Sequence, residues 1–390
     1  MKRIILLIDC ASEFDRKLLR GLTRYSKEHD SWLFYRMPAP IREARDGGRE
    51  IIRWAKKWGA DAIVGRWSSV DTSLLSGLGI PVVLQNYTGR SSIFSNLTGD
   101  YLGTGEIAAK FFIDRGFKEF AYFGIRDIIW SEERLLGYRR EIERTGGRLH
   151  TLMVTDAERE RGTVVRWAKD LPKPVALFVC DDAYALFLTE TCKMENIHIP
   201  DEISLLGVDN DELLCQISDP QMSSITLHVE QGGYRLGEML QKQFDSNDVW
   251  SFNIVISPGE IVQRGSTLRH HIRDPYVDRV VRYIDENFDK PITSDQIISQ
   301  VPLCRRSLEI RFKKEFGTMT LYKYLMECRM DKFARLLETT DLPVNEICDR
   351  CGITNYLNVS RSFKKIYGCS PREYRERKKK EHPVNITQIE

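Results

Sequence analysis

Phe312-Lys313-Lys314-Glu315-Phe316-Gly317 returns 51 residues later as Phe363-Lys364-Lys365-Ile366-Tyr367-Gly368. Each copy closes a short helical pattern, in which an apolar stripe is followed by a basic pair, an aromatic residue and a glycine that can end a helix. Another short helical pattern and a tight turn precede each copy. Two such units in one chain are typical of paired helix-turn-helix motifs, so the repeat makes duplex DNA the first partner to consider.

The pattern around the repeat predicts two DNA-reading helices on a helical connector. The first is expected at Cys304–Phe316 and the second at Asn355–Tyr367, with a long helix through residues 321–337 between them. Arginine reads guanine edges, asparagine reads adenine, and lysine holds phosphates. The side chains that we expect to face the DNA are Arg305, Arg306, Ser307, Glu309 and Lys313 on the first helix, and Asn355, Tyr356, Asn358 and Arg361 on the second.

The positive charge of the chain is concentrated around this repeat. All 390 residues together carry a formal net charge of +2, yet residues 275–380 hold 22 Lys and Arg against 15 Asp and Glu. This segment is therefore at +7, which leaves −5 for the remainder. A basic C-terminal part joined to a mildly acidic body is typical of an anion-binding module attached to a second function.

The first 265 residues alternate between short apolar runs and helical patterns. Strands are expected at Ile4–Ile8, Trp32–Met37, Ala60–Gly65, Pro81–Gln85, Phe120–Gly124, Leu149–Val154, Val175–Cys180 and Ile203–Asp209. Such alternation predicts mostly parallel sheets with right-handed crossovers. The number of units exceeds one doubly wound sheet, so we predict an α/β fold with two parallel sheets, followed by an all-α domain with two helix-turn-helix motifs.

The α/β pattern stops at a short polar and basic segment. This segment ends in Asp274-Pro275, a pair that favours a turn and then a helix with proline in its first position. We therefore expect an α/β domain at residues 1–265, a linker at 266–275, a DNA-binding domain at 276–380 and a disordered tail at 381–390.

Polar side chains follow several of the predicted strands. In open parallel sheets ligands bind beyond the carboxyl ends of the strands, so these residues are candidates for a binding site. They are Asp15, Arg16, Trp130, Arg134, Asp181, Asp209 and Asn210. Carboxylates and guanidinium groups can bind hydroxyls, and an indole can cover the C–H face of a ring, so the set suits a cyclic polyol. Several of these positions also favour helix caps, and capping is the competing explanation for them.

The α/β part resembles the periplasmic-binding-protein-like sensor domain of the LacI/GalR regulators. The resemblance rests on Gly116–Gly124, on Glu133-Arg134 with Gly137-Tyr138, on Pro200–Asn210, and on Ser223–Thr226 with Gly237. It implies two lobes with a sugar between them, contacted by Asp15 or Arg16, Asp100, Arg134, Asp181 and Asp209. We expect no counterpart of the DNA-binding headpiece of that family, because Ile4–Ile8 already reads as the first strand of the sensor domain.

The C-terminal part resembles the AraC/XylS DNA-binding domain. The resemblance is carried by Ile347, Gly352-Ile353-Thr354, Ser360–Lys365 and Gly368–Arg375. Asn358 and Val359 depart from the Tyr-Phe pair that is usual there. The combined architecture resembles sugar-responsive regulators and implies a cytoplasmic homodimer that binds direct-repeat sites. It also implies activation of pentose (xylose-type) catabolic genes through RNA polymerase. A different mono- or oligosaccharide effector, or repression, stays open as the alternative.

Other functional classes find little support in the sequence. The turn after the first strand, Cys10-Ala11-Ser12-Glu13, has no glycine-rich dinucleotide motif, and Arg66-Trp67-Ser68 offers no acceptor for a phospho-receiver. We expect no catalytic residues, no cofactor and no metal. Cys348 and Cys351 form a CxxC without a second ligand pair, which favours reduced packing cysteines. No apolar run of membrane-spanning length is present, so we expect no membrane association.

Overall fold

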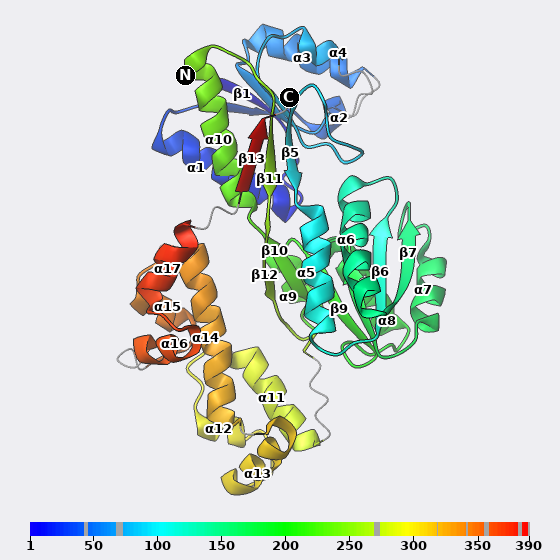
Figure 1. The fold of residues 1–390 in the computed structure, drawn as a ribbon, viewed down its shortest axis with the longest axis vertical. Helices are drawn as coiled ribbons and strands as arrows, with labels where there is room; N and C mark the ends of the chain where they lie inside the picture. Colours follow the sequence, from blue (N-terminus) through cyan, green and yellow to red (C-terminus); the bar gives the residue numbers. More distant parts are fainter. Residues whose placement is uncertain are drawn as a thin grey trace. The chain divides into compact units, whose positions relative to one another are not determined.

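The computed structural model describes residues 1–42, 46–67, 73–268, 274–317, 319–340, 342–354, 359–380 and 384–388 (Figure 1). The chain forms two compact units. The first, here called the sensor unit, comprises Met1–Arg269 together with Pro383–Glu390, and the second, the helical unit, comprises His270–His382. No helix among the described residues is long and apolar enough to cross a membrane.

The first lobe of the sensor unit is built on a seven-stranded sheet in the order β13-β11-β5-β4-β3-β1-β2. The central strands are short and fully buried, which explains why they read as continuous apolar runs rather than alternating ones. Only β13 runs antiparallel, against β11. The strands are β1 (Arg3–Leu7), β2 (Leu33–Arg36), β3 (Ala62–Gly65), β4 (Val82–Leu84), β5 (Ser95–Gly99), β11 (Phe252–Ile256) and β13 (Val384–Gln388).

The second lobe has a six-stranded sheet in the order β12-β10-β9-β8-β6-β7. All neighbours are parallel except the edge strand β12, which is antiparallel to β10. The strands are β6 (Glu119–Ile125), β7 (Arg148–Val154), β8 (Val175–Val179), β9 (Ile203–Val208), β10 (Ser223–Leu227) and β12 (Pro258–Val262). The predicted α/β class with two largely parallel sheets is therefore confirmed.

Helices cover both sheets (Figure 1). In the first lobe they are α1 (Glu13–Glu28), α2 (Ala39–Arg42), α3 (Gly47–Trp58), α4 (Ser73–Ser76) and α10 (Val229–Ser246). In the second they are α5 (Tyr101–Ile113), α6 (Ile129–Thr145), α7 (Arg161–Asp170), α8 (Asp182–Met194) and α9 (Glu212–Ile217). Helices α1 and α10 pack closely because Gly21 has no side chain, and a Cβ there would lie 1.9 Å from the Glu230 carbonyl oxygen.

The chain passes between the lobes at three places, namely after β5, between β10 and α10, and between β11 and β12. Backbone hydrogen bonds tie these crossings together. The Asp100 amide donates to the Ile256 carbonyl at 2.9 Å, and the His228 amide donates to the Ser257 carbonyl at 3.1 Å. Three adjacent crossings form a hinge region beside the carboxyl ends of the strands, where ligands bind in such sheets.

Two segments differ from the sequence-based expectation. Ser266 and Thr267, expected in a linker, are buried in the second lobe, and Ser266 Oγ donates to the Leu205 carbonyl at 2.6 Å. Residues 381–390, expected as a disordered tail, contain β13, which pairs with β11 from Val384 to Gln388. The basic run before it favours disorder, but the alternating sequence Val384-Asn385-Ile386-Thr387-Gln388 fits an edge strand.

The helical unit consists of seven helices within its described residues. They are α11 (Pro275–Asn287), α12 (Ser294–Ile298), α13 (Arg305–Phe316), α14 (Leu321–Thr339), α15 (Val344–Arg350), α16 (Val359–Tyr367) and α17 (Pro371–Lys380). As predicted, Pro275 opens α11, and the Asp274 carboxylate caps it by accepting from Tyr276 N at 3.0 Å. Thr293 caps α12 in a capping box with Gln296.

The repeated sequence corresponds to a repeated packing arrangement. Phe312 stacks on Phe316 with ring centroids 4.5 Å apart, and Phe363 stacks on Tyr367 at the same centroid distance. Each pair belongs to its own core, one formed around α11–α13 and the first half of α14, the other around the second half of α14 and α15–α17. The connector α14 thus contributes to two small helix-turn-helix cores, which is the predicted arrangement.

Candidate functional sites

Arg134 is the centre of a cluster of polar side chains in the sensor unit. Helix α6 places it beyond the carboxyl end of β6, with a side chain that is 4% exposed. One guanidinium nitrogen donates to the Cys180 carbonyl, and Nη2 lies 3.9 Å from Asp209 Oδ1. Its buried Nε has no hydrogen-bond partner among the described residues. A buried donor of this kind is costly unless a ligand or water satisfies it, so Arg134 is suited to bind a hydroxyl.

Two aromatic rings lie close to this guanidinium. Its carbon lies 5.5 Å from the centroid of Trp130 and 5.6 Å from that of Tyr101. Tyr87 meets Trp130 edge to face, with centroids 6.2 Å apart. Arg66 stacks on Tyr87 at 3.9 Å and donates to its hydroxyl at 2.7 Å. Aromatic faces next to a buried arginine can hold the apolar face of a ring whose hydroxyls bind to the charged groups.

Asp209 supplies the carboxylate opposite Arg134. It follows β9 in a left-handed conformation, with φ at 102°, which is unusual for a residue other than glycine. Burial raises the pKa of Asp209 to about 7, and the nearby carboxylate of Asp181 acts in the same direction, whereas Arg134 and Lys17 oppose it. A carboxyl group with this pKa changes between its protonated and its ionised form near neutral pH. A strained backbone conformation together with a shifted pKa is typical of a binding site.

The first lobe contacts this cluster through helix α1. Arg16 Nη2 lies 3.1 Å from Asp211 Oδ2, and Lys17 Nζ donates to the Asp209 carbonyl at 2.9 Å. Arg16 also binds Glu13 at 2.9 Å. These contacts join α1 of one lobe to the loop after β9 of the other. The structure thus gives Arg16 a role between the lobes, while Asp15 is buried on the same helix with an exposure of 2%.

Three other predicted residues already accept hydrogen bonds from protein groups. Asp100 caps α5 by accepting from Gly103 N at 2.9 Å, and Asp181 caps α8 by accepting from Tyr184 N at 2.8 Å. Asn210 Oδ1 accepts from Arg264 at 2.9 Å. The capping explanation considered from the sequence thus applies to Asp100 and Asp181. Asp181 still has acceptor capacity, and burial raises its pKa in the same way as that of Asp209.

The sequence reading did not include Lys17, Arg66, Tyr87 or Tyr101 among the candidates. Arg66, Tyr87 and Tyr101 lie within three residues of the carboxyl ends of β3, β4 and β5, and Lys17 lies in the second turn of α1, the helix that follows β1. The signal that could have found them was the strand-end rule itself, applied to the short strands β3 and β4 as well as to the longer ones. Tyr87 is the clearest omission, because it contacts both Arg66 and Trp130; burial raises the pKa of its hydroxyl, and Arg66 opposes this.

A second contact between the lobes is the ion pair of Arg90 with Glu133. Arg90, between β4 and β5, donates to both carboxylate oxygens of Glu133 on α6, at 2.6 and 2.7 Å. The Ile129 amide donates to the Tyr87 carbonyl at 2.7 Å beside it. Bidentate arginine–carboxylate pairs are directional as well as charge-assisted, so this pair can fix the relative position of the two lobes.

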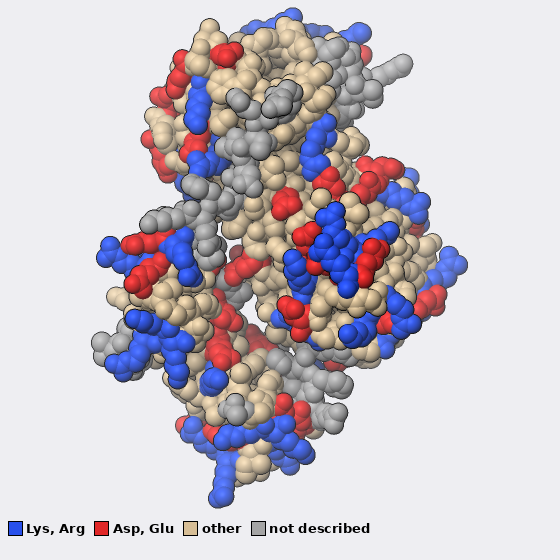
Figure 2. Space-filling view, viewed as in Figure 1, with Lys and Arg blue, Asp and Glu red and all other residues tan. Residues whose placement is uncertain are grey.

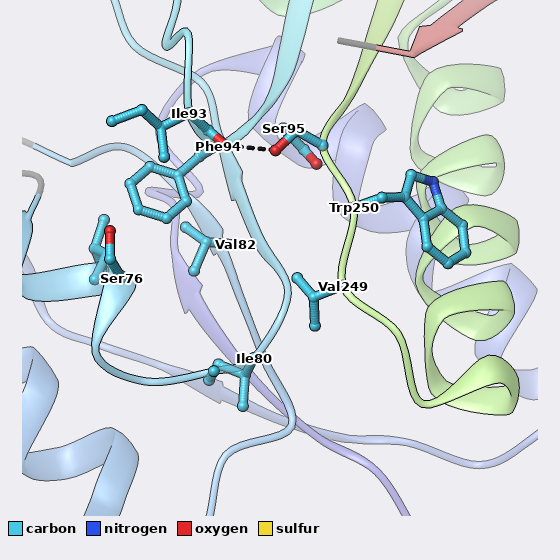
Figure 3. Close-up of a pocket in the computed structure, with 11 residues that line it drawn as sticks. Ser76, Ile80, Val82, Ile93, Phe94, Ser95, Val249 and Trp250 are labelled. Carbon is cyan, nitrogen blue, oxygen red and sulfur yellow. Dashed lines mark hydrogen bonds between the residues drawn. The ribbon is translucent and has the colours of Figure 1, made fainter. Parts of the chain in front are cut away.

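A pocket of about 200 Å³ lies elsewhere in the first lobe, before the amino ends of β4, β5 and β11. Figure 3 shows Val82, Phe94 and Val249 around it, while the Trp250 ring points to the other side of its strand. Its lining contains no charged residue. It therefore lacks the donors and acceptors of the Arg134 cluster and lies at the opposite end of the sheet from the site that the sequence predicts.

The helical unit presents basic side chains on α13. Arg305, Arg306 and Lys313 are exposed there, whereas Ser307 and Glu309 are half-buried, and Arg305 Nε lies 3.6 Å from Glu309 Oε1. Figure 2 shows Lys and Arg gathered at the end of this unit that α13 forms. On the second helix, α16, Arg361 is exposed. The predicted contacts Asn355, Tyr356 and Asn358 lie outside the described residues. No metal-binding group of His, Cys, Asp or Glu occurs among the residues that the structure describes.

Comparison with known proteins assigns a domain type to each unit. Residues 109–267 match the periplasmic binding protein-like domain, and residues 299–377 match a helix-turn-helix domain. The xylose operon regulatory protein of Escherichia coli (strain K12) is 25% identical over 390 residues, covering 96% of this chain and 97% of that protein. The chain is homologous to the xylose operon regulatory proteins. These homologues are regulators of transcription and not enzymes, which agrees with the prediction that the chain is not an enzyme.

Further relatives support the same two-part architecture. The xylose operon regulatory protein of Haemophilus influenzae is 26% identical over 293 residues, 72% of this chain and 75% of that protein. The solved structure of the xylose-binding transcription activator XylR matches with a TM-score of 0.59 at 23% identity, over 96% of this chain and 97% of the other. A LacI family regulator from Enterococcus faecium with bound ribose matches 68% of the chain and 98% of its own length, with a TM-score of 0.57 at 17% identity. These structures establish the fold of the sensor unit and, for the first, of the whole chain.

Proposed function

We propose that this protein is a sugar-responsive, DNA-binding regulator of transcription. The observation that carries the proposal is the full-length similarity to the xylose operon regulatory proteins, combined with a buried Arg134 whose Nε lacks a partner among the described residues. The effector proposed is a pentose of the xylose type. Its hydroxyls would bind the Arg134 guanidinium and the carboxylates of Asp181 and Asp209, and its C–H face would lie on Trp130.

Effector binding would act on the contacts between the lobes. Arg16 and Lys17 already reach from α1 to the loop that carries Asp209. A sugar bound to Asp209 would therefore stabilise the arrangement in which α1 and this loop are joined. A ligand shifts such an equilibrium only by its different affinity for the two arrangements, so the bridging groups decide how strongly the sugar acts.

The output is DNA binding by a cytoplasmic homodimer. Two helix-turn-helix cores joined by α14 can place α13 and α16 in successive major grooves, which lie about 34 Å apart on one face of the duplex. A dimer would then read two adjacent half-sites arranged as a direct repeat. In this proposal the sugar changes the sensor dimer, positions the helical units, and activates genes of sugar catabolism through contact with RNA polymerase.

A thermal-shift screen of the full chain against pentoses and hexoses tests the sensor function. The sugar that binds should raise the unfolding temperature of the sensor unit, since a ligand at 100 times its Kd contributes about 2.7 kcal/mol. Tryptophan fluorescence reports this unit alone, because all seven tryptophans precede residue 251. The bound sugar should be recovered unchanged. No stabilisation by any sugar, or turnover of one, would contradict the proposal.

Activation and repression are separated by transcription in vitro. A template with the selected binding site, RNA polymerase and the full chain are incubated with and without the sugar that stabilises the protein. An activator raises the transcript level only when both the sugar and the chain are present. A repressor of the same architecture lowers it when the sugar is absent. A hexose or an oligosaccharide as the stabilising ligand would replace the pentose in the proposal without changing its class.

A further inference from the structure

Ile310 occupies the outward centre of the first helix-turn-helix reading helix. Leu308 and Phe312 are fully buried on α13, and Ile310 lies two residues from each. At 100° per residue it therefore points about 160° away from both of these core-facing side chains. Ile310 is 62% exposed. A single exposed aliphatic residue is unremarkable on a general surface, but here it lies on the face that the proposed function assigns to DNA.

The internal repeat provides an independent reference for this position. Leu308 and Phe312 correspond to Val359 and Phe363, which are 2% and 0% exposed, and the stacked aromatic pairs that follow share their geometry. By the same offset of 51 residues, Arg361 occupies in the second repeat the position that Ile310 occupies in the first. One unit thus carries an exposed guanidinium at the position where the other carries an exposed hydrocarbon.

The surroundings of Ile310 argue against a protein-binding patch. Four residues lie one helical turn away from Ile310: Arg306, Lys313 and Lys314 are exposed cations, and Ser307 is half-buried. An aliphatic side chain surrounded by cations matches a DNA groove, where the phosphates attract the cations and a base edge offers an apolar group to the aliphatic side chain. In the major groove that group is the C5-methyl of thymine, which aliphatic side chains contact, whereas arginine reads guanine.

We propose that Ile310 is a specificity-determining residue that reads a thymine methyl group in the half of the site bound by α13, while Arg361 reads a different base or a phosphate in the other half. This proposal rests on the proposed DNA-binding function. It implies that the two helix-turn-helix units do not read the same sequence, although their cores are repeats of each other. Each binding site should therefore be asymmetric within one protomer's footprint.

The test starts with selection of duplexes from a random library by the full chain, by Ile310→Ala and by Ile310→Val. Each thymine of the selected site is then replaced in turn by deoxyuridine, which removes only the methyl group. For the unaltered chain, one such replacement should weaken binding about fourfold, the loss expected for one methyl-sized apolar contact. Ile310→Ala should bind the thymine and deoxyuridine duplexes equally, and Ile310→Val should retain part of the difference.

Each result has a defined meaning. Arg361→Ala is the matched control, because it removes an exposed side chain at the equivalent position and should keep the thymine-to-deoxyuridine difference. Unchanged unfolding temperatures show that the variants are folded. If Ile310→Ala keeps the full penalty, or if no thymine shows one, the Ile310 proposal is overturned while DNA recognition stands. If the unaltered chain enriches no sequence at all, both this proposal and the proposed function are overturned.

Discussion

Arg134 and Asp209 face each other at 3.9 Å between Nη2 and Oδ1, from two elements that are far apart in the sequence. Arg134 comes from α6 and Asp209 from the left-handed turn after β9, so neither position is local to the other. The separation leaves the pair short of a direct hydrogen bond, and the Arg134 Nε has no partner among the described residues. The two groups are thus placed to share a ligand.

Asp209→Asn should weaken sugar binding by about 10- to 100-fold, since a hydrogen bond to a charged group is worth about 1.5–3 kcal/mol. The amide keeps the size of the side chain and removes the charge. Isothermal titration calorimetry with the stabilising sugar measures the change. Asp170→Asn, at the exposed end of α7, is the control and should bind normally.

The double variant Arg134→Ala with Asp209→Ala extends this test to function. It removes both members of the pair together, so neither Arg134 nor Asp209 is left without the other. We expect it to lose the response to sugar and to keep sugar-independent DNA binding, because the helical unit has its own cores. Unchanged sugar affinity in this variant would show that the ligand binds elsewhere in the chain.

The pKa of Asp209 predicts a pH-dependent stability of the sensor unit. Burial raises this pKa to about 7, whereas the unfolded value is about 3.9. Between these values the folded state binds the proton and the unfolded state does not, so the free energy of unfolding falls as pH rises from about 4 to about 7. The positive charges of Arg134 and Lys17 lower the pKa of Asp209 and so reduce this loss of stability. The negative charges of Asp181 and Asp211 raise the pKa and so increase the loss.

Urea unfolding between pH 4 and pH 8, followed by tryptophan fluorescence without sugar, measures this dependence. Asp209→Asn should lose less stability than the unaltered chain as pH rises to 7, and the two curves should run parallel above pH 8. Part of the slope should remain, because burial also raises the pKa of Asp181 and Asp182. Parallel curves over the whole range would mean that Asp209 ionises at its ordinary pKa in the folded protein.

The bidentate contact of Arg90 with Glu133 predicts a coupling between lobe position and sugar affinity. Glu133→Gln should weaken sugar binding about two- to fivefold, a modest factor because both side chains are partly exposed to solvent. The control is Glu106→Gln, which removes the contact of Glu106 with Arg140, at 3.6 Å, within one lobe. Calorimetry should show a loss for the first variant only. Equal affinities in both variants would mean that this pair does not hold the lobes together when sugar is bound.

Much of the fold was predictable because its signals are local. The apolar runs gave β1, β3, β8 and β9 to within one or two residues at each end. Strand β5 was missed because its sequence, Ser95-Asn96-Leu97-Thr98-Gly99, is polar although all five residues are buried. Its polar side chains bind within the lobe, as when Asn96 Nδ2 donates to Asn253 Oδ1 at 2.8 Å. Such partners lie 157 residues apart and leave no local pattern.

The candidate sites also divide into features that local sequence predicts and features that depend on contacts between distant residues. The strand-end rule predicted Arg134 and Asp209 as neighbours, and the structure places them 3.9 Å apart, because elements that follow the buried strands of one parallel sheet meet at the same edge. It did not reveal that Arg16 serves as a contact between the lobes, since that depends on how α1 meets the loop after β9. Ile310, which we propose as a DNA contact, was not predicted from the sequence for another reason. The search for DNA contacts favoured polar side chains, whereas the exposure of an aliphatic residue is visible only once the helix is packed.

Lys313→Ala and Arg306→Ala separate two kinds of DNA contact on α13. Lys313 is expected to hold a phosphate, so its loss should weaken all duplexes alike and reduce the slope of log K against log salt by about 1. Arg306 lies beside Ile310 on the outward face, so its loss should relax the preference at one base pair. Binding titrations on the selected site and on a scrambled duplex, at several salt concentrations, measure both effects. A uniform loss for Arg306→Ala would assign it to the backbone.

Gly352 and Gly368 predict different costs for the same substitution in the helical unit. Both have positive φ, at 64° and 76°, so alanine should cost about 1–2 kcal/mol at either position.

Only at Gly352 does a Cβ meet backbone, 2.3 Å from the Lys290 carbonyl oxygen. That carbonyl is held by Arg329, which donates to it at 2.8 Å and to the Phe288 carbonyl at the same distance, so it cannot move away freely. Gly352→Ala should therefore cost about 3 kcal/mol or more, while Gly368→Ala, with open space around its Cβ, should cost only the conformational part. Thermal unfolding followed by far-UV circular dichroism reports both units, and tryptophan fluorescence, which reports the sensor unit alone, should show that this unit is unchanged in both variants. Equal costs would mean that the backbone at Lys290 shifts despite Arg329, and that Gly352 is needed for its φ alone.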